Sequence, residues 1–330
     1  METMKKTASS PVGEKLKRLL ESRGFVQLLP LLFLVLLVGF FSVATKGRFT
    51  QPTSLKIILD QALIVGTVAT GAAFIFASGN VNLAMGATTV LTATIAGMAY
   101  NATGSVAVMF AVAIALGVVL MVVSVLLSTL FHVRVMFVTI VMMSLLAAIQ
   151  QSILGGSTVS LPYDMITGLS NKGFSYIAFA AYFLVCAVLF HCTDVGRALR
   201  LLGTNETCAE QTGIVKRKYL TIAFIIGGVG CGIGALLAIV RAGSIGQNTL
   251  GSLNMDCMLA LVLGGMSIFG GSKSFMYAGI IGAITVVVLS QGLLMVGVDS
   301  TIIQGVRGIV FLLLVCTAQK RPQGLPAPEG

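Results

Sequence analysis

The sequence predicts an all-α membrane protein with about ten transmembrane helices and both termini in the cytoplasm. Three observations support this fold class. The composition is too apolar for a soluble domain, and the apolar residues gather in runs of membrane-spanning length. The basic residues fall mainly in alternate connections between those runs.

The composition indicates that the chain folds in a lipid bilayer and not in water. Of the 330 residues, 56% are hydrophobic and only 10% are charged, and the mean hydropathy is +1.00. Soluble domains carry about 25% charged residues. A soluble fold could not bury so many apolar groups and still keep a wettable surface, whereas a bilayer accepts them. The 38 glycines agree, because glycine is more frequent in membrane helices than in soluble ones.

The apolar runs define the spans. A bilayer needs about 20 apolar residues for each spanning helix. This window predicts ten spans, at residues 25–44, 57–78, 83–100, 105–131, 133–154, 174–192, 219–240, 253–269, 275–295 and 301–318. The first run is longer than the roughly 7–15 residues of a signal-peptide core, so we expect it to be retained as a helix.

The basic residues predict the orientation. With the N-terminus inside, the cytoplasmic segments hold 15 of the 21 basic residues and the outer segments hold five. Lysine and arginine accumulate on the cytoplasmic side, so both termini are predicted to lie there. The inner set is Lys5, Lys6, Lys15, Lys17, Arg18, Arg23, Arg134, Arg197, Arg200, Lys216, Arg217, Lys218, Lys273, Lys320 and Arg321; the outer set is Lys46, Arg48, Lys56, Lys172 and Arg241. The formal charge of +10 therefore reflects topology, and no nucleic-acid partner is expected.

The chain is predicted to have three parts: a cytoplasmic N-terminal segment (1–24), a transmembrane domain (25–318) and a cytoplasmic tail (319–330). Two connections within the domain are longer than a simple link needs. The outer loop at 155–173 is polar and rich in turn residues, and the inner loop at 193–218 carries eight charged residues.

The inner loop contains signals for short helices outside the membrane. Gly203 is expected to break one helical stretch, and Thr207-x-x-Glu210 has the pattern of a capping box. Gly213 suits the position just after a helix. A structured and charged inner loop indicates a docking element for a partner.

Several tempting motifs predict no chemistry. GGMSIFGGSKS (264–274) lacks the G-K-[ST] order of a phosphate loop, because Ser272 intervenes. GGVGCGIG (227–234) lies inside a span, where glycines four residues apart predict close helix packing. The six cysteines form no CxxC pair, and His132 and His191 form no cluster. We expect no catalytic residue, metal or cofactor.

Polar residues interrupt the apolar runs at two places. SGNVNLAMG (78–86) carries Asn80 and Asn82 between two spans, and it fits either a broken helix that offers amides to a solute or an ordinary tight inner turn. Asp256 at the start of the eighth span and Arg307 in the tenth are predicted to lie at similar depth. A charge in a membrane usually has a partner, so we hypothesise that these two form a pair.

Three stretches give the sequence a family resemblance. GNVNLAMG (79–86) resembles the pattern G-G-I-D-L-S-V-G, and LGTNETCAEQTGI (202–214) is similar to G-x-N-x-x-A-A-x-x-S-G-I. MDCMLALVLGGMSIFGGSKS (255–274) resembles L-D-A-I-A-A-V-V-I-G-G-x-S-L-x-G-G-x-G-S. All three patterns belong to ribose-type (simple sugar) permeases of ABC transporters. The departures are Asn80, Asn82, Ala84 and Lys273, where the family has Gly, Asp, Ser and Gly.

The resemblance implies a permease subunit of an ABC importer, multi-pass in the cytoplasmic (inner) membrane and not itself an enzyme. It implies an ATPase subunit inside, an extracellular solute-binding protein, and a second permease that is the same or a related chain. The candidates for the solute path are Asn80, Asn82, Asp256 and Arg307, and those for ATPase coupling are Gly203, Asn205, Glu206, Glu210 and Gly213.

Alternatives remain for the solute and for the class. The solute is expected to be a sugar or sugar-like molecule, with a nucleoside or another small polar solute as the alternative. An ion-coupled secondary transporter would need acids or bases at mid-membrane, whereas most acidic residues here lie in loops or near span ends. A receptor or structural protein would not need the charged, capped inner loop.

Overall fold

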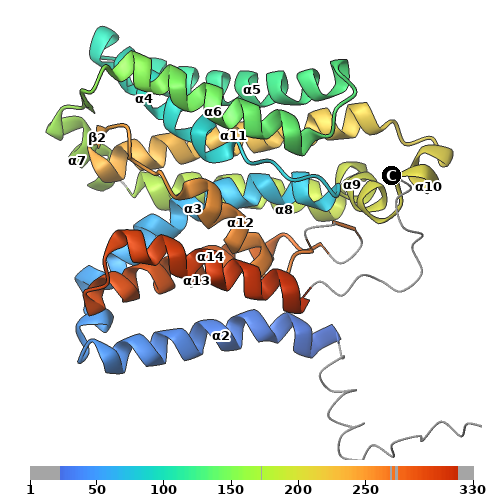
Figure 1. Ribbon diagram of the computed structural model, residues 1–330. Helices are drawn as coiled ribbons and strands as arrows, with labels where there is room; N and C mark the ends of the chain where they lie inside the picture. The colour runs from blue at the N-terminus through green and yellow to red at the C-terminus, as the bar shows by residue number, and fades with distance from the viewer. Residues whose placement is uncertain (1–22, 172, 268–269, 272–273, 319–330) are drawn as a thin grey trace, which may run out of the picture.

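The computed structural model describes residues 23–318, except 172, 268–269 and 272–273. Nearly all of the predicted N-terminal segment and the whole predicted tail lie outside these residues. The helices run side by side along one direction, with α9 and α10 at one end and α7 and the short strands at the other (Figure 1). The elements are α2 (Arg23–Ala44), η1 (Arg48–Thr50), α3 (Pro52–Ala77), α4 (Met85–Thr103), α5 (Val106–Leu130), α6 (Val135–Leu154), β1 (Val159–Ser160), α7 (Tyr163–Asn171), α8 (Phe174–Cys192), α9 (Asp194–Thr204), α10 (Glu206–Gln211), α11 (Lys216–Ala242), β2 (Ser244–Ile245), α12 (Leu253–Leu263), α13 (Tyr277–Val296) and α14 (Ser300–Ala318).

A helix lies in each of the ten predicted spans. Within the described residues, six helices are long and apolar enough to cross a membrane: α3, α5, α6, α8, α11 and α13. The all-α membrane class is therefore confirmed, whereas the count of ten spans stays a prediction.

Helix α12 is shorter than the sequence predicted. The predicted helix at 253–269 ends at Leu263, because Gly264 and Gly265 follow and Gly265 has a φ of +92°. At about 1.5 Å per residue, the 11 residues of α12 reach about 16 Å, roughly half of the hydrocarbon thickness. Another element must therefore span the rest of the hydrocarbon layer at one end of α12.

Glycines let the central helix α11 approach its neighbours, as the 227–234 motif predicted. A Cβ on Gly228 would lie 2.6 Å from the Cα of Val118, and one on Gly232 would lie 2.7 Å from the carbonyl oxygen of Ala113. Both contacts are on α5, where Gly117 faces Gly228. Close backbone approach of this kind stabilises helix association in membranes. The hydrophobic effect does not drive helices together there, because lipid tails are as apolar as the helix surfaces.

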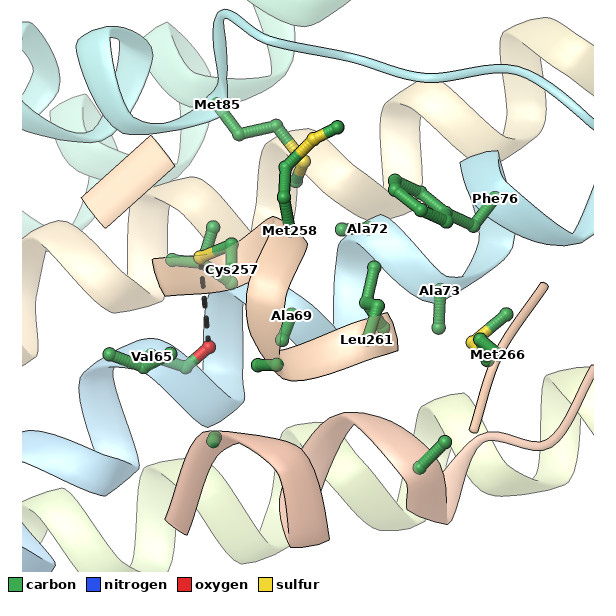
Figure 2. Close-up of a cluster of buried hydrophobic side chains, with 14 of the residues drawn as sticks. Val65, Ala69, Ala72, Ala73, Phe76, Met85, Cys257, Met258, Leu261 and Met266 are labelled. Carbon is green, nitrogen blue, oxygen red and sulfur yellow. Dashed lines mark hydrogen bonds between the residues drawn. The ribbon is translucent and has the colours of Figure 1, made fainter. Parts of the chain in front are cut away.

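Helix α12 packs one face into the buried core. Figure 2 shows the sulfur of Cys257 directed at the carbonyl oxygen of Val65 in α3, and Met258 directed toward Met85. On its other flank α12 meets α13, where a Cβ on Gly282 would overlap the carbonyl oxygen of Ala260. The short helix is thus held by close packing on two sides.

The outer loop is folded. Strand β1 pairs antiparallel with β2, with Val159 opposite Ile245, and α7 packs against α11 and α8. Ile245 is fully buried. This small outer layer lies over the end of the bundle opposite α9 and α10 (Figure 1).

Candidate functional site

Two helices begin inside the bundle and touch at their starts. The connection from α3 to α4 turns at Ser78–Gly79 and then runs as an extended segment to Met85. Figure 1 shows α4 and α12 both starting well within the length of the bundle. The backbone N–H of Gly86 donates to Oδ1 of Asn254, which joins the first turns of the two helices. The segment 78–86 thus combines a tight turn at Ser78–Gly79 with a non-helical stretch before α4, so each of the two interpretations describes part of it.

Several polar groups of this segment find hydrogen-bond partners inside the protein. Asn82 is 4% exposed, and its Oδ1 accepts from the N–H of Ala84 while its Nδ2 lies 3.3 Å from the sulfur of Met121. The N–H of Leu83 donates to Oγ1 of Thr139. Asn80 is partly buried and donates to Oγ of Ser78. Irregular backbone at membrane depth requires such internal partners. Contact of Asn80 or Asn82 with a solute stays a prediction.

Asp256 and Arg307 form the hypothesised pair. Nη1 of Arg307 lies 2.8 Å from Oδ1 of Asp256, and the two side chains are 10% and 4% exposed. Nε of Arg307 donates to Oγ of Ser290 at 2.9 Å, and Oγ of Ser252 donates to Oδ2 of Asp256 at 2.9 Å. We call Ser252, Asp256, Ser290 and Arg307 the polar network.

The polar network ties α14 to α12 and α13. Among the α14 side chains that the structure describes, Ile303 and Arg307 are the two that are buried. Breaking a buried ion pair by removing one partner costs about 3–5 kcal/mol, because the other charge stays buried and uncompensated. The attachment of α14 therefore depends strongly on one charge pair, which a local rearrangement would release.

A pocket of about 200 Å³ opens beside this network. Its polar lining is Ser252, Gln304 and Arg307, and its apolar lining includes Met255, Leu259 and Phe311. Gly251 and Gly308 complete the wall. We call it the α12–α14 pocket.

The sequence pointed to two members of this region and missed the rest. Asp256 and Arg307 were visible because charges in apolar runs are rare. Ser252 stands four residues before Asp256, a helical spacing that would have suggested a contact. Ser290 and Gln304 gave no signal, because single polar residues are common in membrane helices.

The inner loop forms two short helices, α9 and α10, which lie at one end of the bundle (Figure 1). The cap of α10 differs from the prediction: Oδ1 of Asn205 accepts from the N–H of Cys208, so Asn205 and not Thr207 is the N-cap. At the other end Gly213 has a φ of +85°, and the N–H of Ile214 donates to the carbonyl of Ala209. The predicted position of Gly213 after the helix is thus confirmed.

Gly203 was predicted to break a helical stretch, and it lies in the last turn of α9, one residue before that helix ends at Thr204. It is small for a different reason: a Cβ there would lie 2.2 Å from the carbonyl oxygen of Ala77 and 2.6 Å from the N–H nitrogen of Gly271. The N–H of Gly271 also donates to the carbonyl of Ala77 at 3.2 Å. We call Gly203, Ala77 and Gly271 the inner joint. A Cβ on Gly203 would also lie 3.1 Å from the backbone nitrogen of Gly79, so all three resemblance segments meet beside this joint.

Most of the charged residues of the inner loop lie on its surface, whereas Arg200 is half-buried and donates to the carbonyl of Gly196. Glu206 and Lys216 form an exposed ion pair, Asp194 and Arg197 form another, and Glu210 is exposed. Pairs of this kind add little to stability. Their exposure leaves them available to a polar partner surface.

Comparison with known proteins identifies the family. Residues 54–315 match the family described as "Branched-chain amino acid transport system / permease component". The chain belongs to this permease family. It is a transport component and a multi-pass protein of the cytoplasmic membrane, and the expected resemblance to ABC permeases is confirmed.

Three curated relatives align with most of the permease. The ribose import permease protein of Escherichia coli (strain K12) is 27% identical over 88% of this chain and 93% of its own length. The fructose import permease protein of Rhizobium meliloti is 24% identical over 88% and 84%. The autoinducer 2 import system permease protein of Yersinia enterocolitica is 25% identical over 86% and 88%. No solved structure gives a significant match.

Proposed function

We propose that this permease forms half of the translocation path of an ATP-driven importer for a sugar or sugar-like solute. The observation that carries the proposal is the inner joint, where a structured, charged loop meets the bundle backbone to backbone. A loop that only linked two spans would need neither the caps nor this fit. The full-length similarity to import permeases supports the same role.

The proposed partners follow from this arrangement. An ATPase subunit would receive α10 in a cleft on the cytoplasmic side, with Asn205, Glu206, Glu210 and Gly213 shaping or charging the contact. A solute-binding protein would dock at the outer layer of β1, β2 and α7. A second permease, the same or a related chain, would complete the path.

Movement of the ATPase would reach the bundle through the inner joint. Closure of the ATPase subunits would displace α10 and α9, and Gly203 would pass that displacement to the end of α3 and to the segment before α13. Gly203 has no side chain between these backbones that could absorb it. The rocking of packed helices around a fixed central site is the usual mode of alternating access.

A neutral polyol suits the polar network better than the amino acid in the family description. Arg307 is already compensated by Asp256, and Asp256 also accepts from Ser252. An amino acid zwitterion would need one free charge of each sign. A hydroxylated neutral solute needs only hydrogen-bond partners.

Reconstitution tests the function. The permease should co-purify with the ATPase encoded beside it, and proteoliposomes of the complex should take up labelled D-ribose or D-fructose when ATP and the binding protein are present. L-Leucine serves as the control solute. Absence of an ATPase in the complex, or uptake without ATP, would overturn the proposal.

We also propose ten spans with both termini in the cytoplasm, which cysteine labelling tests. Ser170→Cys on α7 and Glu206→Cys on α10 are both at exposed positions. A membrane-impermeant thiol reagent applied to intact cells should label the cysteine at 170 and not that at 206. The reverse pattern would invert the topology.

A further inference from the structure

The two helices that border the α12–α14 pocket each turn one face toward it. On α12, Ser252, Met255 and Leu259 line the pocket, whereas Cys257, Met258 and Leu261 pack into the core (Figure 2). The pocket is therefore on the side of α12 that faces α14.

Helix α14 also has two different faces, one that lines the pocket and one that is apolar and exposed. Gln304, Arg307, Gly308 and Phe311 line the pocket at helical spacings of three and four residues, so they share one face. The other side of α14 carries large exposed apolar side chains, Ile302, Ile309 and Leu312, which suit lipid. A polar and glycine-containing face at membrane depth suits water or a solute.

Arg307 has hydrogen-bonding capacity beyond the polar network. A guanidinium carries five N–H donors. The contacts to Asp256 and Ser290 use Nη1 and Nε, and within the described part of the chain no further partner contacts this side chain. Gln304 adds an amide with both donor and acceptor groups.

The size and lining of the pocket limit its ligand. Pockets for drug-sized ligands measure roughly 300–1,000 Å³, so a volume of about 200 Å³ fits a smaller molecule. The charges of Arg307 and Asp256 compensate each other, which favours a neutral ligand. Each wall carries both polar and apolar groups, with Ser252, Met255 and Leu259 at α12 and Gln304, Arg307 and Phe311 on α14. This mixed lining matches a sugar ring, whose edge bears hydroxyls and whose faces expose C–H groups.

We propose that the α12–α14 pocket is the solute subsite of this permease and binds a single neutral monosaccharide, with Gln304, Arg307 and Ser252 contacting its hydroxyls. The inference rests on the proposed function and deepens it. It also gives a role to the glycine at 308, because a side chain as bulky as leucine or phenylalanine there would occupy the space that the sugar needs.

Two cysteine variants one residue apart test the pocket. Gly308→Cys lies in its wall, and Ile309→Cys lies at the same depth on the apolar side, where the native residue is 63% exposed. Both would be made with Cys192, Cys208 and Cys316 replaced by serine, because the other three cysteines are buried. The complex with the ATPase would be exposed to a positively charged thiol reagent, with and without millimolar D-ribose, D-arabinose, D-fructose, D-glucose or D-galactose.

We expect the cysteine at 308 to react, the cysteine at 309 not to react, and at least one sugar to protect the cysteine at 308. Reaction at 308 that no sugar slows would overturn the subsite. So would the absence of reaction at 308, which would place lipid or a second permease against the pocket.

Uptake by the complex supplies the second measurement. Gln304→Leu should raise the sugar concentration for half-maximal uptake about three- to tenfold, the effect of losing one hydrogen bond, while Ile309→Leu leaves it unchanged. Equal values for the two variants would contradict the proposal. If the parent complex takes up no sugar, the proposed function fails, and the labelling result still decides whether the pocket binds one.

Discussion

The inner joint and the polar network connect parts of the bundle by opposite means. At the inner joint, backbone meets backbone, and Gly203 leaves no space for a side chain between Ala77 and Gly271. In the polar network, side chains of α12, α13 and α14 meet through one ion pair and two hydrogen bonds. A contact between backbones cannot shift without moving both segments, so it suits the transmission of a displacement from α9 to the bundle. A side-chain network can break and reform, so it suits a site that opens.

The largest effect is expected from unpairing the polar network. Arg307→Met would leave Asp256 buried without a counter-charge and should lower the free energy of unfolding by about 3–5 kcal/mol. Denaturant titration of the purified permease in mild detergent measures it. The double variant Asp256→Leu/Arg307→Met should recover most of the loss, because an apolar pair has no charge to desolvate. A double variant as unstable as the single one would show that the pair is not the source of the effect.

At the inner joint we expect a smaller effect on stability and a clear effect on binding of the ATPase subunit. Gly203→Ala would place a Cβ against the carbonyl of Ala77 and shift α9 from the bundle. The affinity for the ATPase should fall about tenfold, which corresponds to ~1.4 kcal/mol. Gly168→Ala is the matched control, since Gly168 lies in helix α7 with open space around it. Parent-like binding and transport-coupled ATP hydrolysis in Gly203→Ala would remove the joint from the mechanism.

The smallest effect on stability is expected at the exposed pair of Glu206 and Lys216. Glu206→Gln should change the free energy of unfolding by no more than about 0.2–1 kcal/mol, because water and salt screen the pair. If α10 docks in a polar cleft, the same change should weaken binding of the ATPase, more at low salt than at high salt. Binding that is identical to that of the parent at both salt concentrations would show that this charge does not face the partner.

Helix positions were largely predictable from the sequence, because the membrane requires long apolar runs. Each predicted span contains a helix, and the glycines of 227–234 pack against α5 as their spacing indicated. The length of α12 was not predictable from hydropathy, since the residues after Leu263 are as apolar as a helix would be. Only the two glycines at 264 and 265 marked its end.

The candidate site was predictable only where charge made it visible. The Asp256–Arg307 pair followed from the rule that membrane charges have partners. Gly203 was interpreted by its helix propensity, whereas its small size serves a contact with Ala77, 126 positions earlier, that no local pattern encodes. Thr207 fitted a capping pattern, but Asn205 stood closer to the true start of α10.

The length of α12 decides where this bundle insulates the membrane electrically. A helix of about 16 Å covers half of the hydrocarbon, and the rest of the barrier at that position falls to the turns at 246–252 and to the strand pair above them. Buried Ile245 and the hydrogen bond from Nε2 of Gln150 to the carbonyl of Gly246 hold this layer in place. Loosening this layer would expose the start of α12 to water, and we expect the membrane potential of a resting cell to leak before uptake changes.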